Sequence, residues 1–409
     1  MAGQEKRRMR LFRIKRKNLE IAFFALAVIL LAVAPVCAQG SARQAQPAPT
    51  RIMEILVTVL ILSVLIVAHE FGHFIMARKV GVRVEKFSLG FGPKLFSRKV
   101  RDTEYILSAI PLGGFVKLAG DDMQEYTGKP DEYFSKSIFE RFKIIFFGPL
   151  LNYAAGFLFF WLIFFTGYPT LTNKIGGFVD NSTAEASGLR LEDEITAVDG
   201  KNISSWVEIV RAIQAKKSGE KVSLSFLRGG KEEVISVPVK EEELSDATGA
   251  KHKIGLIGIG PKFIRVRHGL FAAFFLGLGE TWNLTLLTYK GLWMMLSGEL
   301  SIKNSVTGLL GIYVITSRAV SAGMTAVLHL FAILSISLGL FNILPFPVLD
   351  GGHMFFLLLE KIRGKALSAK VDAVLTRLGM SLLIFFVVLV TYNDVLRFFG
   401  ERIAKLFDR

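Results

Sequence analysis

The sequence has a single cysteine, Cys37, among 409 residues. An intramolecular disulfide and a cysteine-rich zinc site are therefore excluded, and any metal must be bound by histidine and carboxylate side chains. Acidic residues are also outnumbered, at 35 against 50 lysines and arginines, which gives a net charge of +15.

Charged residues are missing from several long segments, and 51% of the chain is hydrophobic. Such a chain is too apolar for a soluble globule, so we expect a polytopic α-helical membrane protein with about four core transmembrane helices. A fifth apolar run, Leu270–Leu296, is interrupted by Glu280 and Lys290. The four segments of spanning length cover residues 54–76, 141–167, 325–347 and 378–399, with approximate ends.

The basic residues gather beside the apolar runs. Residues 1–20 contain eight lysines and arginines against two glutamates, and further clusters follow at 78–101 and 361–370. Basic clusters beside spanning segments are typical of cytoplasmic loops, so we expect contact with the lipid bilayer and no nucleic-acid partner.

The N-terminal extension, residues 1–52, has three open interpretations. A basic region, an apolar core and the residues Val36-Cys37-Ala38 resemble a secretory signal peptide and its cleavage site. The same segment could remain as an uncleaved anchor. Met53 opens the next apolar run and would itself make a natural start of the chain.

A His-Glu-x-x-His motif, formed by His69, Glu70 and His73, ends an uncharged apolar stretch. On a helix this spacing places both imidazoles on one face, one turn apart, where they chelate a single Zn²⁺ ion. Ionisable groups at membrane depth are costly without a partner or a metal. We expect His69 and His73 to bind zinc and Glu70 to act as the general base for peptide hydrolysis.

A catalytic zinc site takes three protein ligands and a water, so a third ligand is required. Asp350 is the outstanding candidate, because residues 342–353 follow an apolar run and interrupt it with two prolines and two glycines. Such interruptions expose backbone groups to a ligand or substrate. Glu360 lies too near a basic loop, whereas His353 is the rival ligand and otherwise orients the site.

The order of crossings bears on the fifth apolar run. The histidine motif and Asp350 both lie near the carboxyl ends of their apolar segments, so these segments must run parallel for the groups to meet. The first span crosses from outside to inside and the second span returns. The span at 325–347 can run parallel to the first only if an even number of further crossings, most simply none, lies between it and the second span. We therefore expect Leu270–Leu296 to lie on the membrane surface within a connector covering 263–322.

Two glycine-containing segments between the first two spans alternate in hydropathy and predict short strands. They contain Gly90 and Gly92, and Gly113 and Gly114. A membrane-associated β-hairpin there could offer an edge strand to an extended substrate peptide, with these four glycines as candidate substrate-binding positions. A purely structural cover for the site is the alternative.

Residues 173–240 are polar and glycine-punctuated, and they predict strands at 177–179, 195–198, 221–227 and 233–239 with helices at 184–188 and 205–216. Residues 181–195, Asn-Ser-Thr-Ala-Glu-Ala-Ser-Gly-Leu-Arg-Leu-Glu-Asp-Glu-Ile, resemble a circularly permuted bacterial PDZ domain. Thr183 and Glu192 depart from the proline and glycine of that pattern. We expect a PDZ-like α+β domain outside the cytoplasm.

Taken with Gly148-Pro149-Leu150-Leu151-Asn152 and the segment from Asn342 to Gly351, these motifs resemble the bacterial site-2 proteases of the regulator-of-sigma-E type. The resemblance implies an intramembrane zinc metalloprotease of the bacterial inner membrane, with zinc held by His69, His73 and Asp350, and Glu70 catalytic. It implies single-span membrane protein substrates, such as anti-sigma factors or signal-peptide remnants, already cut outside the membrane by a site-1-type protease.

We therefore expect two catalytic parts, residues 53–167 and 325–400, joined through the PDZ-like domain and the connector. Asn152 and Asn342 are further candidates to bind the substrate backbone, although membrane-helix asparagines often serve only packing. A membrane zinc transporter is one alternative function, but the other spans lack carboxylates. A catalytically idle PDZ scaffold is another, and it would have little use for an intact Glu70.

Overall fold

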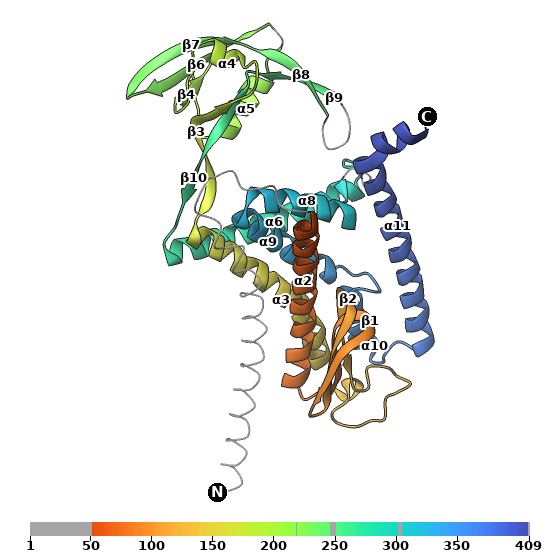
Figure 1. Ribbon diagram of the computed structural model, residues 1–409. Coiled ribbons are helices and arrows are strands. Elements are labelled where there is room, and N and C mark those ends of the chain that lie inside the picture. The colour runs from red at the N-terminus through yellow and green to blue at the C-terminus, as the bar shows by residue number, and fades with distance from the viewer. Residues whose placement is uncertain (1–50, 218, 246–250, 302–304, 408–409) are drawn as a thin grey trace.

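The computed structural model describes residues 51–217, 219–245, 251–301 and 305–407, arranged as a group of helices and a β-rich domain (Figure 1). Residues 1–50, and with them nearly all of the extension predicted at 1–52, lie outside the described residues. Within the described chain, the first helix, α2 (Arg51–Lys79), begins two residues before Met53.

Five described helices are long and apolar enough to cross a membrane. Four of them correspond to the spans expected from the sequence, but α9 (Met324–Ile343) ends four residues before the expected end at 347. Outside the β-rich domain, the described residues form three shorter helical segments between these helices: η1 (Tyr133–Ser135), α8 (Leu309–Ala322) and α10 (Asp350–Arg363). The five long helices are α2 (Arg51–Lys79), α3 (Ile138–Thr166), α6 (Leu270–Leu296), α9 (Met324–Ile343) and α11 (Ala369–Phe407).

Helix α6 is the segment expected on the membrane surface. It packs along the second half of α3: the Tyr153 and Thr285 hydroxyl oxygens are 2.9 Å apart, and the Phe157 ring meets the Phe274 ring edge-on. Because α6, although the least apolar of the five, is still long and apolar enough to cross a membrane, length and composition alone do not separate it from a true span. Its surface position stays a prediction.

The helices approach closely where glycine replaces a side chain. A methyl group built on Gly72 of α2 would lie 2.1 Å from the carbonyl oxygen of Phe147 on α3. One built on Gly156 of α3 would lie 2.8 Å from the carbonyl oxygen of Ala332 on α9. Close backbone approach through small residues is how helices associate in lipid, where apolar side chains gain nothing by leaving a solvent that is itself apolar.

The predicted hairpin between the first two spans is confirmed, and its strands are longer than expected: β1 (Val84–Val100) and β2 (Thr103–Leu118). The pair folds back on itself, so that residues 86–89 of β1 lie between residues 104–107 and residues 114–117 of β2. Residues 114–118 consequently form one edge of this folded-back hairpin. The hairpin lies against the lower half of α2 (Figure 1).

The β-rich domain has the predicted order of elements through residue 239. Its central sheet runs β10-β3-β4-β6-β7, and its core is built from residues such as Ile175, Ile209 and Phe226. The elements are β3 (Tyr168–Phe178), α4 (Thr183–Ala186), β4 (Glu194–Val198), β5 (Lys201–Asn202), α5 (Trp206–Gln214), β6 (Lys221–Arg228), β7 (Lys231–Pro238), β8 (Lys240–Ser245), β9 (Lys251–Leu256) and β10 (Ile259–Val266).

The expected domain boundary at 173–240 is too narrow. Strand β10 pairs with β3 from Val266 opposite Tyr168 to Ile259 opposite Phe178, and Ile257 joins the core. The domain therefore spans 168–266, and β3 and β10 together join it to the helices (Figure 1). Sequence reasoning missed this because the closing strand lies beyond a charged segment that reads as a linker.

Helix α11 stands at the side of the bundle (Figure 1). Near its end, the buried Asp394 carboxylate accepts hydrogen bonds from the backbone N–H groups of Gly308 (3.0 Å) and Gly311 (2.9 Å) at the start of α8. A carboxylate at a helix N-terminus pairs with otherwise unbonded N–H groups and with the positive end of the helix dipole. This contact attaches α11 to the bundle.

Candidate metal centre

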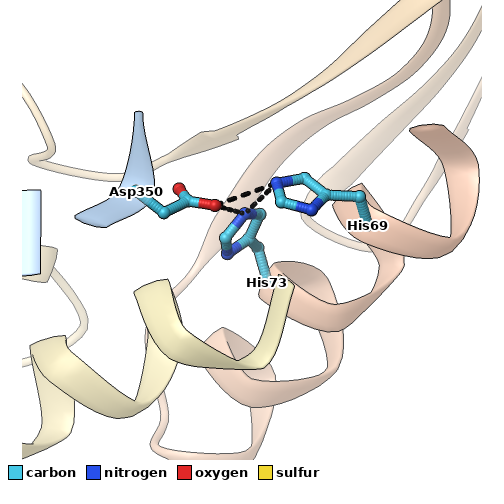
Figure 2. A group of neighbouring side chains, drawn as sticks. All are labelled: His69, His73 and Asp350. Atoms are coloured by element: carbon cyan, nitrogen blue, oxygen red, sulfur yellow. Dashed lines mark hydrogen bonds and ion pairs between the residues drawn. The ribbon is translucent and has the colours of Figure 1, made fainter. Parts of the chain in front are cut away.

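Three predicted ligands meet at one point (Figure 2). His69 and His73 project from one face of α2, and Asp350 is the first residue of α10. The Nε2 atom of His69 lies 2.9 Å from Oδ2 of Asp350, and Nε2 of His73 lies 3.5 Å from it. The two Nε2 atoms are 3.2 Å apart. The chain thus brings together residues separated by nearly 280 positions.

These separations fit a tetrahedral zinc ion. Bonds of about 2.0–2.1 Å to nitrogen and oxygen place tetrahedral ligands roughly 3.3 Å apart. Oδ2 of Asp350 is buried and, among the described residues, accepts no hydrogen bond of acceptable angle, although two imidazole nitrogens lie beside it. Two imidazole nitrogens and a carboxylate oxygen held around one point are the arrangement that a cation stabilises.

Helix α3 orients both histidines. Nδ1–H of His73 donates to the carbonyl oxygen of Ile144 at 2.9 Å, which leaves Nε2 free for a metal. A methyl group on Gly148 would lie 2.3 Å from the His73 ring, so the absence of a side chain there makes room for the imidazole.

Asn152 supports the other histidine. It is fully buried, and its side-chain amide lies 3.4 Å from Nδ1 of His69. Metal binding through Nε2 puts the hydrogen on Nδ1, so the amide must present its oxygen, a half-turn that also gives a partner to an otherwise unpaired Oδ1. This burial favours orientation of His69 over the direct substrate contact expected for Asn152.

The edge of the hairpin reaches the expected general base. A methyl group on Gly114 would lie 3.3 Å from Cγ of Glu70, so the backbone of β2 runs directly beside this side chain. The Ser63 hydroxyl of α2 donates to the carbonyl oxygen of Pro111 at 2.7 Å and holds β2 there. The edge at residues 114–118 therefore begins beside Glu70.

The other three glycines form the bends of the hairpin. Gly90 and Gly92 have positive φ angles of 87°, which side chains rarely adopt, and the Gly113 backbone lies against the Phe91 ring. They shape the edge, and Gly114 is the one beside Glu70.

Two further candidates lie outside the ligand group. His353 is exposed and meets the ring of Phe356 edge-on, and the metal-capable group found among the described residues consists of His69, His73 and Asp350. The rival prediction that His353 is the third ligand is therefore not supported. Asn342 lies half-buried in the last turn of α9, and its predicted role in substrate binding stays a prediction.

Comparison with known proteins decides the family. The model of Peptidase family M50 matches residues 57–386. The chain belongs to this family. Its members include the site-2 proteases, so the chain is a metallopeptidase of the site-2 protease type, as the motifs predicted.

The relatives agree with this assignment along nearly their whole length. A protein of Campylobacter jejuni, provisionally named a zinc metalloprotease, is 36% identical over 356 residues, covering 85% of this chain and 95% of that protein. A protein of Fusobacterium nucleatum with the same provisional name is 30% identical and is covered completely. Zinc metalloprotease RasP of Oceanobacillus iheyensis is 27% identical, with 83% of this chain and 98% of that protein covered.

Among solved structures, the PDZ domain of an SdrC-like protein from Listeria monocytogenes aligns with 22% of this chain and 85% of that domain, at 26% identity and a TM-score of 0.17.

Proposed function

We propose that this M50 peptidase hydrolyses a peptide bond within or beside the transmembrane helix of single-span membrane proteins, after a first cut by a site-1-type protease outside the membrane. The observation that supports this most is the convergence of His69, His73 and Asp350 beside Glu70 and the edge of β2. Anti-sigma factors and signal-peptide remnants are substrates of the expected kind.

A helical substrate hides its carbonyl groups in intrahelical hydrogen bonds, so it must unwind before hydrolysis. The edge at residues 114–118 pairs with β1 on one side, and the backbone N–H groups of Val116 and Leu118 donate to the carboxylates of Glu70 and Asp121. An unwound segment would pair with the remaining backbone groups of this edge as an added strand. Pairing would replace the lost helical hydrogen bonds, which are costly to leave unmade in an apolar environment.

The proposed ligands His69, His73 and Asp350 would hold zinc, which when bound supplies Lewis-acid polarisation of the scissile carbonyl and of water at neutral pH. Glu70 follows a ligand directly in sequence but is not itself within the ligand group. Its carboxylate accepts a proton from the attacking water and then delivers that proton to the nitrogen of the departing amine. The water oxygen forms a bond to the scissile carbonyl carbon, the C–N bond breaks, and Glu70 returns to its carboxylate form.

We further propose that the protein lies in a bacterial inner membrane with the β-rich domain outside the cytoplasm and residues 361–370 inside. The domain lies at the end of the bundle opposite α10, whose first residue is Asp350 (Figure 1). This separation supports a role in admitting substrates, as a size filter or docking site, rather than in the chemistry. A zinc transporter would require further metal sites along a path, and one candidate group is found in the described residues.

The test is a Glu70→Gln variant reconstituted in liposomes with a single-span substrate already shortened outside the membrane. The amide keeps the shape of the side chain but cannot accept a proton, so cleavage should fall by at least about a thousandfold while zinc content and thermal stability stay at wild-type values. Residual cleavage within tenfold of wild type would overturn the general-base role. A zinc-loaded wild-type protein that cleaves no membrane substrate would leave the transporter alternative.

A further inference from the structure

A buried ion pair connects α3 to the end of α10 that lies farther from the metal centre. Arg141, near the start of α3, is 5% exposed, and its guanidinium donates to both carboxylate oxygens of Glu360 on α10, at 2.5 and 3.1 Å. The rings of Phe134 and Tyr133 face the same guanidinium, 5.7 and 6.0 Å from its central carbon. A bidentate, ring-enclosed pair of this kind fixes orientation as well as distance.

The ion pair and Asp350 occupy opposite ends of one rigid helix. Glu360 follows Asp350 by ten residues, which at 1.5 Å per residue is about 15 Å along α10. The other end is held by close packing: methyl groups on Gly351 and Gly352 would each lie 2.1 Å from a carbonyl oxygen, of Ile343 and Phe346 respectively. A helix held at both ends cannot rotate or slide, and its first carboxylate inherits that constraint.

The ion pair also completes a pattern on α3. Arg141, Ile144, Gly148 and Asn152 recur every three or four residues and so share one face of the helix. Ile144 and Gly148 contact His73, and Asn152 contacts His69. Arg141, on the same face, forms the ion pair with Glu360 on the helix that carries Asp350.

We propose that Arg141 is a positioning residue for the metal centre, which through Glu360 holds α10 in the register that places Asp350 against His69 and His73. One face of α3 then orients all three ligands, two through direct contacts and the third through the ion pair. The inference rests on the ligand set proposed above. Breaking the pair leaves a buried charge without its partner, so α10 is expected to shift until Glu360 reaches water.

The experiment measures the metal centre without relying on proteolysis. Full-length Arg141→Ala and Glu360→Gln proteins are loaded with Co²⁺, whose visible absorption depends on the geometry of its ligands, or with Zn²⁺, whose release to a chelator is timed. A matched control is Arg228→Ala in the β-rich domain, where Arg228 makes an equally bidentate pair with the buried Asp193, at 2.7 and 2.9 Å.

For both Arg141→Ala and Glu360→Gln, the expected result is a changed Co²⁺ spectrum and roughly 10–100-fold faster zinc release, as for other residues that orient metal ligands. The Arg228→Ala control should keep the wild-type spectrum and release rate even though it loses a comparable ion pair. Arg141→Lys keeps the charge but not the bidentate geometry, and its release rate should fall between those of wild type and Arg141→Ala.

A further variant covers the case in which a lone buried charge prevents folding. Arg141→Met combined with Glu360→Met replaces the pair by apolar side chains of similar length, which proteins commonly tolerate. A folded double variant with a wild-type spectrum and release rate would overturn the positioning role, as would unchanged values in the folded single variants. If Asp350→Ala also binds Co²⁺ with a wild-type spectrum, the proposed ligand set fails first, and the two failures are distinguished.

Discussion

The helical region and the β-rich domain place their apolar residues in opposite ways. In the β-rich domain, α5 turns Trp206, Ile209 and Ile213 into a closed core, and exposed positions are mostly polar. In α11 only 11% of the most apolar stretch is buried, and large apolar side chains such as Phe385 are exposed. The helical region is therefore built for a hydrocarbon solvent, and the β-rich domain for water.

Buried polar groups join the helices of the helical region. Inside the helical region, Asn152, Ser335 and Asp394 are buried, and each forms a hydrogen bond to a residue of another helix or its N-terminus. These contacts join helices that hydrophobic burial cannot join in lipid. The two regions consequently depend on different forces, and damage to one should leave the other intact.

The largest expected effect separates the two regions at the metal. Asp350→Ala removes one of three proposed protein ligands, so zinc content should fall from about one per chain to a small fraction of that. The β-rich domain should remain folded, because its core is independent of α10. Metal analysis of purified protein, with limited proteolysis of the domain, measures both; full zinc in Asp350→Ala would move the third ligand elsewhere.

An intermediate effect is expected from a change that destabilises the β-rich domain and leaves the metal centre unchanged. Ile209 is completely buried in the core of the β-rich domain, and Ile209→Ala should cost this domain about 2–5 kcal/mol of stability through the cavity it leaves. Zinc content and cleavage of a shortened substrate should not change. Protease sensitivity of the domain at increasing temperature, measured beside zinc content, tests this; parallel loss of zinc would show that the two regions are coupled.

The smallest effect on catalysis is expected from removing the β-rich domain altogether. The backbone N–H of His268 donates to the carbonyl oxygen of Phe164 at 3.1 Å, so the ends left by deleting residues 168–266 lie side by side and a short glycine-serine linker can join them. Zinc binding and cleavage of shortened substrate should persist. Full-length substrate, which the intact enzyme should refuse, should become cleavable.

Both substrate lengths must be compared for both enzyme forms at equal expression. If the deletion protein is folded and zinc-loaded but no longer cleaves the shortened substrate, the β-rich domain takes part in presenting substrate and the size-filter role is wrong.

The chemistry of the site could be predicted from the sequence because it depends on residue type and helical spacing. His69 and His73 stand one turn apart whatever surrounds them, and Asp350 is conspicuous as a carboxylate in apolar sequence. The ion pair could not be found in this way. The sequence neighbours of Glu360 are basic, whereas its actual partner, Arg141, is 219 positions distant.

The fold of the β-rich domain was predictable up to its closing strand. Local turns and alternating hydropathy identify β4, β6 and β7, but β10 contributes mainly through its pairing with β3, and pairing leaves no local pattern. The folded-back register of the hairpin was hidden for the same reason. In both regions the sequence indicates the conformation of a segment well, but it does not indicate which other segment that one pairs with.

The glycine contacts between helices have a consequence for how this protein tolerates change. Insertion into a bilayer depends on average hydropathy, whereas the joints at Gly72, Gly156 and Gly351 depend on the absence of one methyl group. A variant with the same apolar residues in a different order would still insert into the membrane. Its helices would not pack together, and the candidate metal centre would not form. In this chain, hydropathy determines insertion into the membrane, and glycine at a few positions determines how the helices pack.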